Sequence, residues 1–145
     1  MNSTRKIQEV VIATLVFQLW GLESNAHHDV LDAINLNNPF EIVGQVAAVD
    51  LGRPHSTLEI LIRRVSGKDQ IWRIQMDDRR ALSERGFTDV SLQNLEWVKV
   101  IVYLPEGSVC VDECNGYGLS LTDTENNSYT LSNDISARLR QLKVE

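Results

Sequence analysis

The stretch TLEILIRRVSGKDQIWRIQM, residues 57–76, decides the fold because two alternating apolar segments flank a polar turn in it. Residues 57–63 and 71–76 each place an apolar side chain at every second position, which is the pattern of a strand with one buried face. The turn sequence SGKD at residues 66–69 is typical of a hairpin connection. The stretch therefore predicts an antiparallel hairpin. Its inward side chains are Leu58, Ile60, Ile62, Trp72, Ile74 and Met76.

The segment before this hairpin predicts another strand, over residues 40–49. Gly44 within it indicates a bulge or a sharp coil, because glycine has no side chain to pack in a strand. Residues 51–55 contain glycine and proline and predict a turn. Residues 27–38 are rich in asparagine and predict an N-terminal arm. The inward side chains of the strand are expected to be Phe40, Ile42, Val46 and Ala48.

Downstream of the hairpin, residues 77–86 predict a short helix. Asp77 and Asp78 offer an N-cap, and Gly86 stands where a glycine ends many helices. The remaining expected elements are a strand over residues 97–104, weaker strands over residues 117–122 and 129–131, and a short helix over residues 134–143.

Short strands with one small helix between the third and the fourth argue against a parallel α/β sheet, which needs strands that alternate with long helices. This order is that of an OB-fold, a small barrel in which closure removes exposed strand edges. The chain of 145 residues has room for one such domain. We therefore expect a mostly β, OB-like antiparallel barrel over residues 39–145, with a short C-terminal helix.

Residues 1–26 have the order of a secretory signal peptide. Basic residues precede an apolar run, and Ser24 and Ala26 are the small residues that a signal peptidase recognises. Cleavage after Ala26 would release a mature chain that begins at His27, in the periplasm or outside a bacterial cell. The alternative is an uncleaved anchor, but the run is shorter than the ~20 apolar residues that cross a bilayer. We expect no stable membrane anchor after cleavage.

The overall charge limits the partners of the protein. The sequence has 14 basic and 20 acidic residues and a formal net charge of -6. Binding to nucleic acid needs a basic face that displaces counterions from phosphates. We therefore expect no nucleic-acid partner, and expect a small ligand or a protein instead.

Six short motifs lie in order along residues 26–108. They are Ala26-His27-His28, Gly44-Gln45-Val46, Arg53-Pro54-His55, Trp72-Arg73-Ile74-Gln75, Leu82 to Phe87, and Pro105-Glu106-Gly107-Ser108. This series resembles the landmarks of a family of secreted bacterial proteins of unknown function, which carry Ala-His-His, Gly-x-Val, Asn-Pro-His, Trp-x-x-Glu, Leu-x-x-x-Gly-Trp and a Pro-x-x-Gly turn. The resemblance implies a small extracytoplasmic β-rich domain, with no established activity.

Three departures from the family pattern matter. Arg53 replaces an asparagine, Gln75 a glutamate and Phe87 a tryptophan. An amide neither ionises nor accepts a proton. If the glutamate has a chemical role in relatives, Gln75 cannot perform it here, and this chain would be a divergent or inactive member.

All three histidines of the chain, His27, His28 and His55, lie on these landmarks and are candidate metal ligands. A terminal His27 would offer a free amine and an imidazole to Cu(II), and a further imidazole would complete the tetragonal nitrogen site that copper favours. The alternative is a solvated terminus, with His55 as a turn residue. Copper is therefore the cofactor hypothesis, and it requires cleavage after Ala26.

Cys110 and Cys114 are the only cysteines. In an oxidising compartment such a pair favours a disulfide. A redox or metal role is the alternative, although the spacing is not C-x-x-C. An extended chain would hold their Cα atoms about 13 Å apart, beyond disulfide reach, so the chain is expected to turn between them.

Trp97 and Tyr103 alternate with the inward valines of the strand over residues 97–104. They are candidates for an exposed pair on the other side of the barrel wall, where a sugar or a base could stack. Trp72 is expected in the core.

Three functions stay open at this level. The first is a non-enzymatic extracytoplasmic module that binds a small ligand, a metal or another protein. The second is a copper carrier or a copper-dependent enzyme built on His27. The third is a structural or interaction module without a ligand. The sequence has no phosphate-binding glycine loop, no G-x-S-x-G motif and no regular calcium loop.

Overall fold

The computed structural model describes residues 30–65, 67–88 and 96–143. The elements in chain order are η1 (Val30–Ala33), β1 (Ile34–Asp50), β2 (Ser56–Ile62), β3 (Gln70–Met76), α2 (Arg79–Glu84), β4 (Trp97–Pro105), β5 (Glu113–Asp123), β6 (Ser128–Thr130) and α4 (Asn133–Leu142). The expected signal peptide, residues 1–26, lies outside the described residues. Within them, no helix has the length and apolar character needed to span a bilayer.

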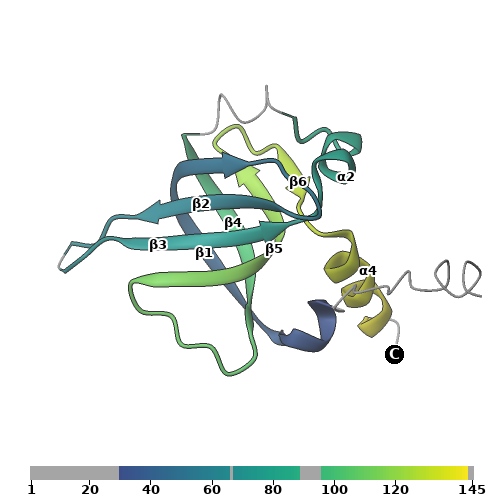
Figure 1. Ribbon diagram of the computed structural model, residues 1–145, viewed down its shortest axis with the longest axis horizontal. Helices are drawn as coiled ribbons and strands as arrows, with labels where there is room; N and C mark the ends of the chain where they lie inside the picture. The colour runs from purple at the N-terminus through teal and green to yellow at the C-terminus, as the bar shows by residue number, and fades with distance from the viewer. Residues whose placement is uncertain (1–29, 66, 89–95, 144–145) are drawn as a thin grey trace, which may run out of the picture.

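The strands close into a barrel (Figure 1). β3, β2, β1, β4 and β5 pair in that order, each antiparallel to the next. β3 and β5 then pair with each other in parallel, which closes the barrel. β6 adds a short antiparallel strand to β5. The predicted fold class, a mostly β OB-like barrel with short helices after the third strand and at the C-terminus, is confirmed.

The hairpin of β2 and β3 forms as the alternation predicts. Leu58 faces Ile74 and Ile60 faces Trp72 across the ladder. Leu58, Ile60 and Ile74 are fully buried, and each such side chain contributes ~1.5–3 kcal/mol by leaving water. In the connecting turn, Gly67 has a φ of 98°, a left-handed conformation that glycine adopts without strain.

β1 differs from the prediction at both ends. It begins at Ile34, inside the range expected to be an arm, because Ile34 is buried in a second apolar cluster with Tyr103 and Ile135. Phe40 is 37% exposed, although its ring lies against that of Trp72. The register shifts between Val46 and Ala48 opposite β2. This bulge leaves Ala48 exposed, so its predicted inward position was wrong.

Gly44 permits a close approach of strands and is not itself the bulge. A Cβ atom there would lie 2.5 Å from Cγ2 of Ile60 and 2.7 Å from the carbonyl oxygen of Leu61. Any side chain would therefore push β1 away from β2. β1 passes from pairing with β4 to pairing with β2 at this point.

α2 covers one end of the barrel (Figure 1). Asp78 is its N-cap and accepts a hydrogen bond of 2.9 Å from the backbone N–H of Ala81, which satisfies a donor that the first turn leaves free. Gly86 follows the helix with a φ of 84°. Leu82 and Phe87 are fully buried in the main core. The N-cap at Asp78 and the position of Gly86 after the helix confirm both ends of the predicted helix.

Candidate functional site

Polar side chains form two rows on the outer face of β2, β3 and β5. Thr57 is in register with Gln75, and Gln75 with Tyr117. In the next row Arg73 is in register with Glu59 and with Asn115. Neighbouring positions such as Leu58 and Ile74 are buried in the core, so strand alternation turns these two rows outward.

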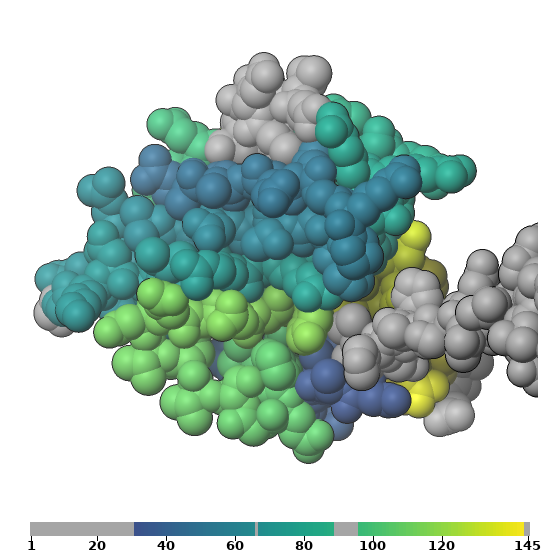
Figure 2. Space-filling model, in the orientation of Figure 1, coloured from purple at the N-terminus to yellow at the C-terminus, as the bar shows by residue number. Residues whose placement is uncertain are grey.

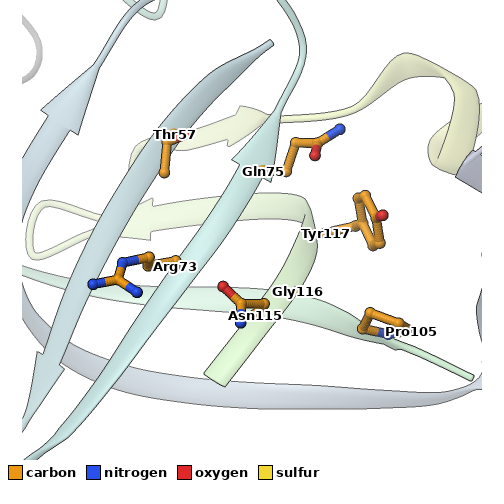
Figure 3. A pocket seen from close by; sticks show the side chains of 7 residues that line it. All are labelled: Thr57, Arg73, Gln75, Pro105, Asn115, Gly116 and Tyr117. Atoms are coloured by element: carbon orange, nitrogen blue, oxygen red, sulfur yellow. The ribbon is translucent and has the colours of Figure 1, made fainter. Parts of the chain in front are cut away.

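This face contains a hollow with a volume of about 220 Å³. The side chains around the hollow come from β2, β3, β4 and β5 (Figure 3). Figure 2 shows β3 and the start of β5 side by side at the molecular surface. The volume is below the ~300–1,000 Å³ of sites that enclose drug-sized molecules, so this central hollow suits one ring-sized group. Its lining includes Thr57, Arg73, Gln75, Pro105, Asn115 and Tyr117.

Arg73 is the cation of the central hollow. Its Nε donates to Glu59 at 2.9 Å and its Nη1 donates to Glu113 at 3.1 Å. The hydrogen bond to Glu59 and the nearby charge of Glu113 raise the pKa of Arg73 above its ordinary value. Arg73 therefore stays protonated, and two carboxylates offset its charge.

The polar atoms of the other lining side chains are free to bind, while the ring of Tyr117 packs in part against the second apolar cluster. Within the described part of the chain, Thr57, Gln75, Asn115 and Tyr117 make no side-chain hydrogen bond to the protein. Together they offer two hydroxyls and two amides, which both donate and accept. The ring of Pro105 and that of Tyr117 add apolar surface. This combination suits a neutral ligand with several hydroxyl or amide groups.

Two smaller hollows adjoin the central one. A hollow of about 40 Å³ shares Gln75 and Tyr117 with it and is also lined by His55. A hollow of about 140 Å³ shares Pro105 with it. His55 and Gln75, from two different sequence landmarks, thus meet at one hollow.

Of the three histidines predicted as metal ligands, the structure describes His55. His27 and His28 lie outside the described residues. His55 is exposed at the start of β2, beside Asp134 and Gln75 around the smallest hollow. Across residues 30–65, 67–88 and 96–143, no three histidine, cysteine or acidic side chains gather as a metal site would require.

The aromatic pair on β4 is not an exposed pair. Trp97 is 44% exposed, whereas Tyr103 is 3% exposed. Tyr103 does lie on the outer side of the barrel wall, but it packs with Ile34 and Ile135 of α4. Burial raises the pKa of its phenol. The expected stacking surface is therefore absent at Tyr103, because a helix covers this part of the wall.

Cys110 and Cys114 are bonded as a disulfide, with their Cα atoms 5.0 Å apart. The bond joins the loop after β4 to the start of β5, where Cys114 is in register with Trp72. Gln70 fixes the same loop by donating to the carbonyl oxygen of Val111 at 2.7 Å. The chain turns between the cysteines, as their spacing requires.

The sequence pattern did not single out Thr57, Arg73, Asn115 and Tyr117. Asn115 lies before the strand predicted over residues 117–122, and the signal at Thr57 and Arg73 is that they occupy polar positions of alternating strands. That pattern is shared by most solvent-facing strand residues. The rows arise from the parallel pairing of β3 with β5, whose register local sequence does not encode.

Comparison with known proteins gives one family assignment. Neither the curated proteins nor the solved structures include a significant match to the chain. A model described as Family of unknown function (DUF6152) matches residues 16–109, which contain β1 to β4 and end before the disulfide. The chain therefore belongs to this family of unknown function.

Proposed function

We propose that the protein is a non-enzymatic extracytoplasmic module that binds a small, neutral, polar ligand in the central hollow. The observation that carries this proposal is the set of four uncommitted side chains, Thr57, Gln75, Asn115 and Tyr117, around a hollow of about 220 Å³. Binding sites combine apolar surface with a few convergent polar groups that fix the orientation of the ligand. The central hollow has both.

A binding role fits the chemistry of the hollow better than catalysis. Arg73 is its charged side chain, and a guanidinium stays protonated at any working pH. A general base must be able to accept a proton near the working pH. In their neutral forms, amides, a threonine hydroxyl and a tyrosine hydroxyl do not meet this condition, so the lining suits recognition.

An extracytoplasmic location is supported by the leader sequence and by the disulfide between Cys110 and Cys114. Disulfides persist in oxidising compartments and are rare in the cytosol. A cleaved leader of the kind in residues 1–26 would deliver the domain to such a compartment.

A fragment titration tests the proposal. Protein purified after export from cells that express the full chain is labelled with ¹⁵N and titrated with monosaccharides, polyols and small amides at millimolar concentration. We expect at least one compound to shift the backbone amide signals of Thr57, Gln75, Asn115 and Tyr117. Tyr117→Ala should reduce the affinity about tenfold, because it removes a ring and a hydroxyl from the hollow.

Lys99→Ala is the matched control, because Lys99 is exposed on β4 and its only ion pair is a 3.6 Å contact with Glu41 within the described residues. It should bind the same compound with unchanged affinity. Shifts confined to another face, or equal affinity in Tyr117→Ala and in the native protein, would contradict the proposal.

We propose copper binding as a second candidate function. It is supported by the position of His55, an exposed imidazole without a side-chain hydrogen bond among the described residues, at a hollow that also contains Asp134. The His27 amine and imidazole would supply two further nitrogen ligands after cleavage. His28 could supply another.

Replacing His27 and His28 together with alanine tests this second function, because it removes the imidazoles that could chelate copper together with the terminal amine. If these histidines hold copper, the exported native protein should bind one Cu(II) and the double variant should bind it at least tenfold more weakly. Equal affinities, or no Cu(II) in the native protein, would rule the copper site out.

A further inference from the structure

Another hollow, of about 440 Å³, lies between α2 and the turn that joins β1 to β2 (Figure 1). It has about twice the volume of the central hollow and shares no lining residue with it. We propose that this arginine hollow binds a soluble small molecule that carries a phosphate monoester. It is a separate site, and its ligand does not depend on that of the central hollow. Its lining includes Leu51, Arg53, Arg79, Arg80, Ser83 and Glu84.

The two sides of the arginine hollow are held together by the fold. The backbone N–H of Arg79 donates to the carbonyl oxygen of Gly52 at 3.2 Å, which ties the start of α2 to the turn. Leu82 anchors α2 because its side chain is fully buried in the main core. Asp78 caps the same helix through the N–H of Ala81. A site whose walls are fixed in this way loses little entropy when a ligand binds.

Arginines come from both sides of the arginine hollow. Arg53 belongs to the turn, whereas Arg79 and Arg80 belong to α2. Among the described residues that line the hollow, Glu84 is the only one with a carboxylate. Its pair with Arg80 is exposed, and exposed pairs of this kind contribute little. The arginine hollow therefore favours an anion, although the whole chain has a net charge of -6.

Two of these arginines keep donors available for a ligand. Arg53 is exposed, and its side chain makes no hydrogen bond or ion pair with another described residue. Arg80 gives its Nε to Glu84 at 3.0 Å, and the N–H groups of its two Nη atoms are further donors. The N–H of Ala81 lowers the pKa of Asp78, and the charges of Arg53 and Arg80 lower it further. The two guanidiniums thus act on the same region from the turn and from the helix.

A phosphate monoester matches these donors better than a carboxylate does. Arginine binds either group through two parallel hydrogen bonds. A carboxylate offers two oxygens in one plane, whereas a phosphate monoester offers three terminal oxygens in a tetrahedral arrangement. The monoester can therefore accept from Arg53, Arg80 and the hydroxyl of Ser83 at once. Its charge of about -1.5 to -2 at neutral pH also strengthens the attraction.

The surroundings favour a soluble ligand over a lipid headgroup. Binding to a membrane surface depends on apolar area that enters the bilayer and on attraction to anionic lipids. Among the described residues, none of the exposed large apolar side chains lines the arginine hollow. Leu51 is half-buried and packs against the main core. The net charge of -6 would also repel an anionic bilayer.

Calorimetric titration of the purified protein tests the proposal. The probes are glycerol phosphate and phenyl phosphate at millimolar concentration, and succinate is the carboxylate for comparison. We expect at least one phosphate monoester to bind at one site for each chain, at least tenfold more tightly than succinate. Tighter or equal binding of succinate would overturn the proposal. So would binding of neither probe, or binding only to vesicles that contain phosphatidic acid.

Arginine variants show where the probe binds. Arg53→Gln should weaken its binding at least tenfold, because it removes a charged donor pair. Arg53→Lys should weaken it less, since lysine keeps the charge but not the planar fork. Arg80→Gln removes a guanidinium from the other side and should also weaken binding.

Arg63→Gln is the matched control, because it makes the same change of charge at an exposed arginine that does not line the arginine hollow. It should bind the probe with native affinity. Thermal unfolding checks that each variant is folded. Equal affinities in Arg53→Gln, Arg80→Gln and Arg63→Gln would contradict the proposed site.

Discussion

Arg85 connects three elements from the end of α2. Its Nη2 donates to Asp77 at 2.9 Å and its Nε donates to the carbonyl oxygen of Thr130 at 2.9 Å. The same carboxylate oxygen of Asp77 accepts from the backbone N–H of Asn133 at 3.0 Å. The side chains of Arg85 and Asp77 are only 18% and 22% exposed. This ion pair therefore fixes the end of β3 to the residues on either side of the β6–α4 connection.

Arg85→Leu should lower the free energy of unfolding by about 2 kcal/mol, since it leaves a partly buried carboxylate and a carbonyl without their donor. Urea denaturation measures the change. Arg80→Leu is the matched control on the same helix, because its pair with Glu84 is exposed and such pairs contribute ~0.3–0.5 kcal/mol. Equal losses in the two variants would contradict this account of Arg85.

Tyr103 gives the protein an alkaline sensitivity. Burial raises the pKa of its phenol in the folded state, so the unfolded chain releases the proton first as the pH rises. Stability is therefore complete below the ordinary pKa of about 10 and falls as the pH rises through the folded-state value. Tyr103→Phe should reduce the loss of stability between pH 9 and pH 11, measured by urea denaturation. An unchanged pH dependence would show that Tyr103 does not contribute to it.

At the scale of elements, α2 depends on its N-cap. Asp78 accepts the N–H of Ala81, and this hydrogen bond lowers the pKa of its carboxyl group. The corresponding stability is present above the unfolded pKa of about 3.9 and is lost as the pH falls through the lower folded value. Asp78→Ala should lower Tm at pH 7 by on the order of a few degrees.

Differential scanning calorimetry at several pH values measures this effect. The difference between Asp78→Ala and the native protein should shrink toward pH 2. Asp78→Asn should fall between them at pH 7, because asparagine retains the acceptor without the charge. A difference that stays constant with pH would contradict the role given to the carboxylate.

The disulfide fixes the start of β5, and we expect the barrel to fold without it. It closes a very short loop, and the loss of chain entropy on closing such a loop contributes at most about 2 kcal/mol. Cys110→Ser combined with Cys114→Ser should therefore lower the free energy of unfolding by no more than about 2 kcal/mol and leave the far-ultraviolet circular dichroism unchanged. Loss of the β signal at 25 °C would show that the barrel needs the bond.

At the scale of the molecule, local pattern predicted the elements, while long-range pairing produced the site. The hairpin of residues 57–76 follows from alternation within one stretch, and α2 follows from Asp78 and Gly86. The central hollow depends on the register of residues 71–75 with residues 113–117. No local pattern specifies that register, so Asn115 and Tyr117 could not be assigned to the site from sequence.

Tyr103 illustrates the same limit. Alternation correctly placed it on the outer side of the barrel wall, but α4 and the start of β1 cover that part of the wall. The exposure of a strand side chain thus depends on which distant elements pack over it. The family match ends at residue 109, so it also leaves out β5, which supplies part of the hollow.

The central claim is that the outer face of β2, β3 and β5 is the ligand site. Its most direct measurement is a crystal structure of the purified protein soaked in a concentrated mixture of glucose, N-acetylglucosamine and acetamide. The account predicts ligand density in the central hollow, with hydrogen bonds to the amides of Gln75 and Asn115. Density bound only elsewhere on the molecule, with the central hollow holding water alone, would contradict it.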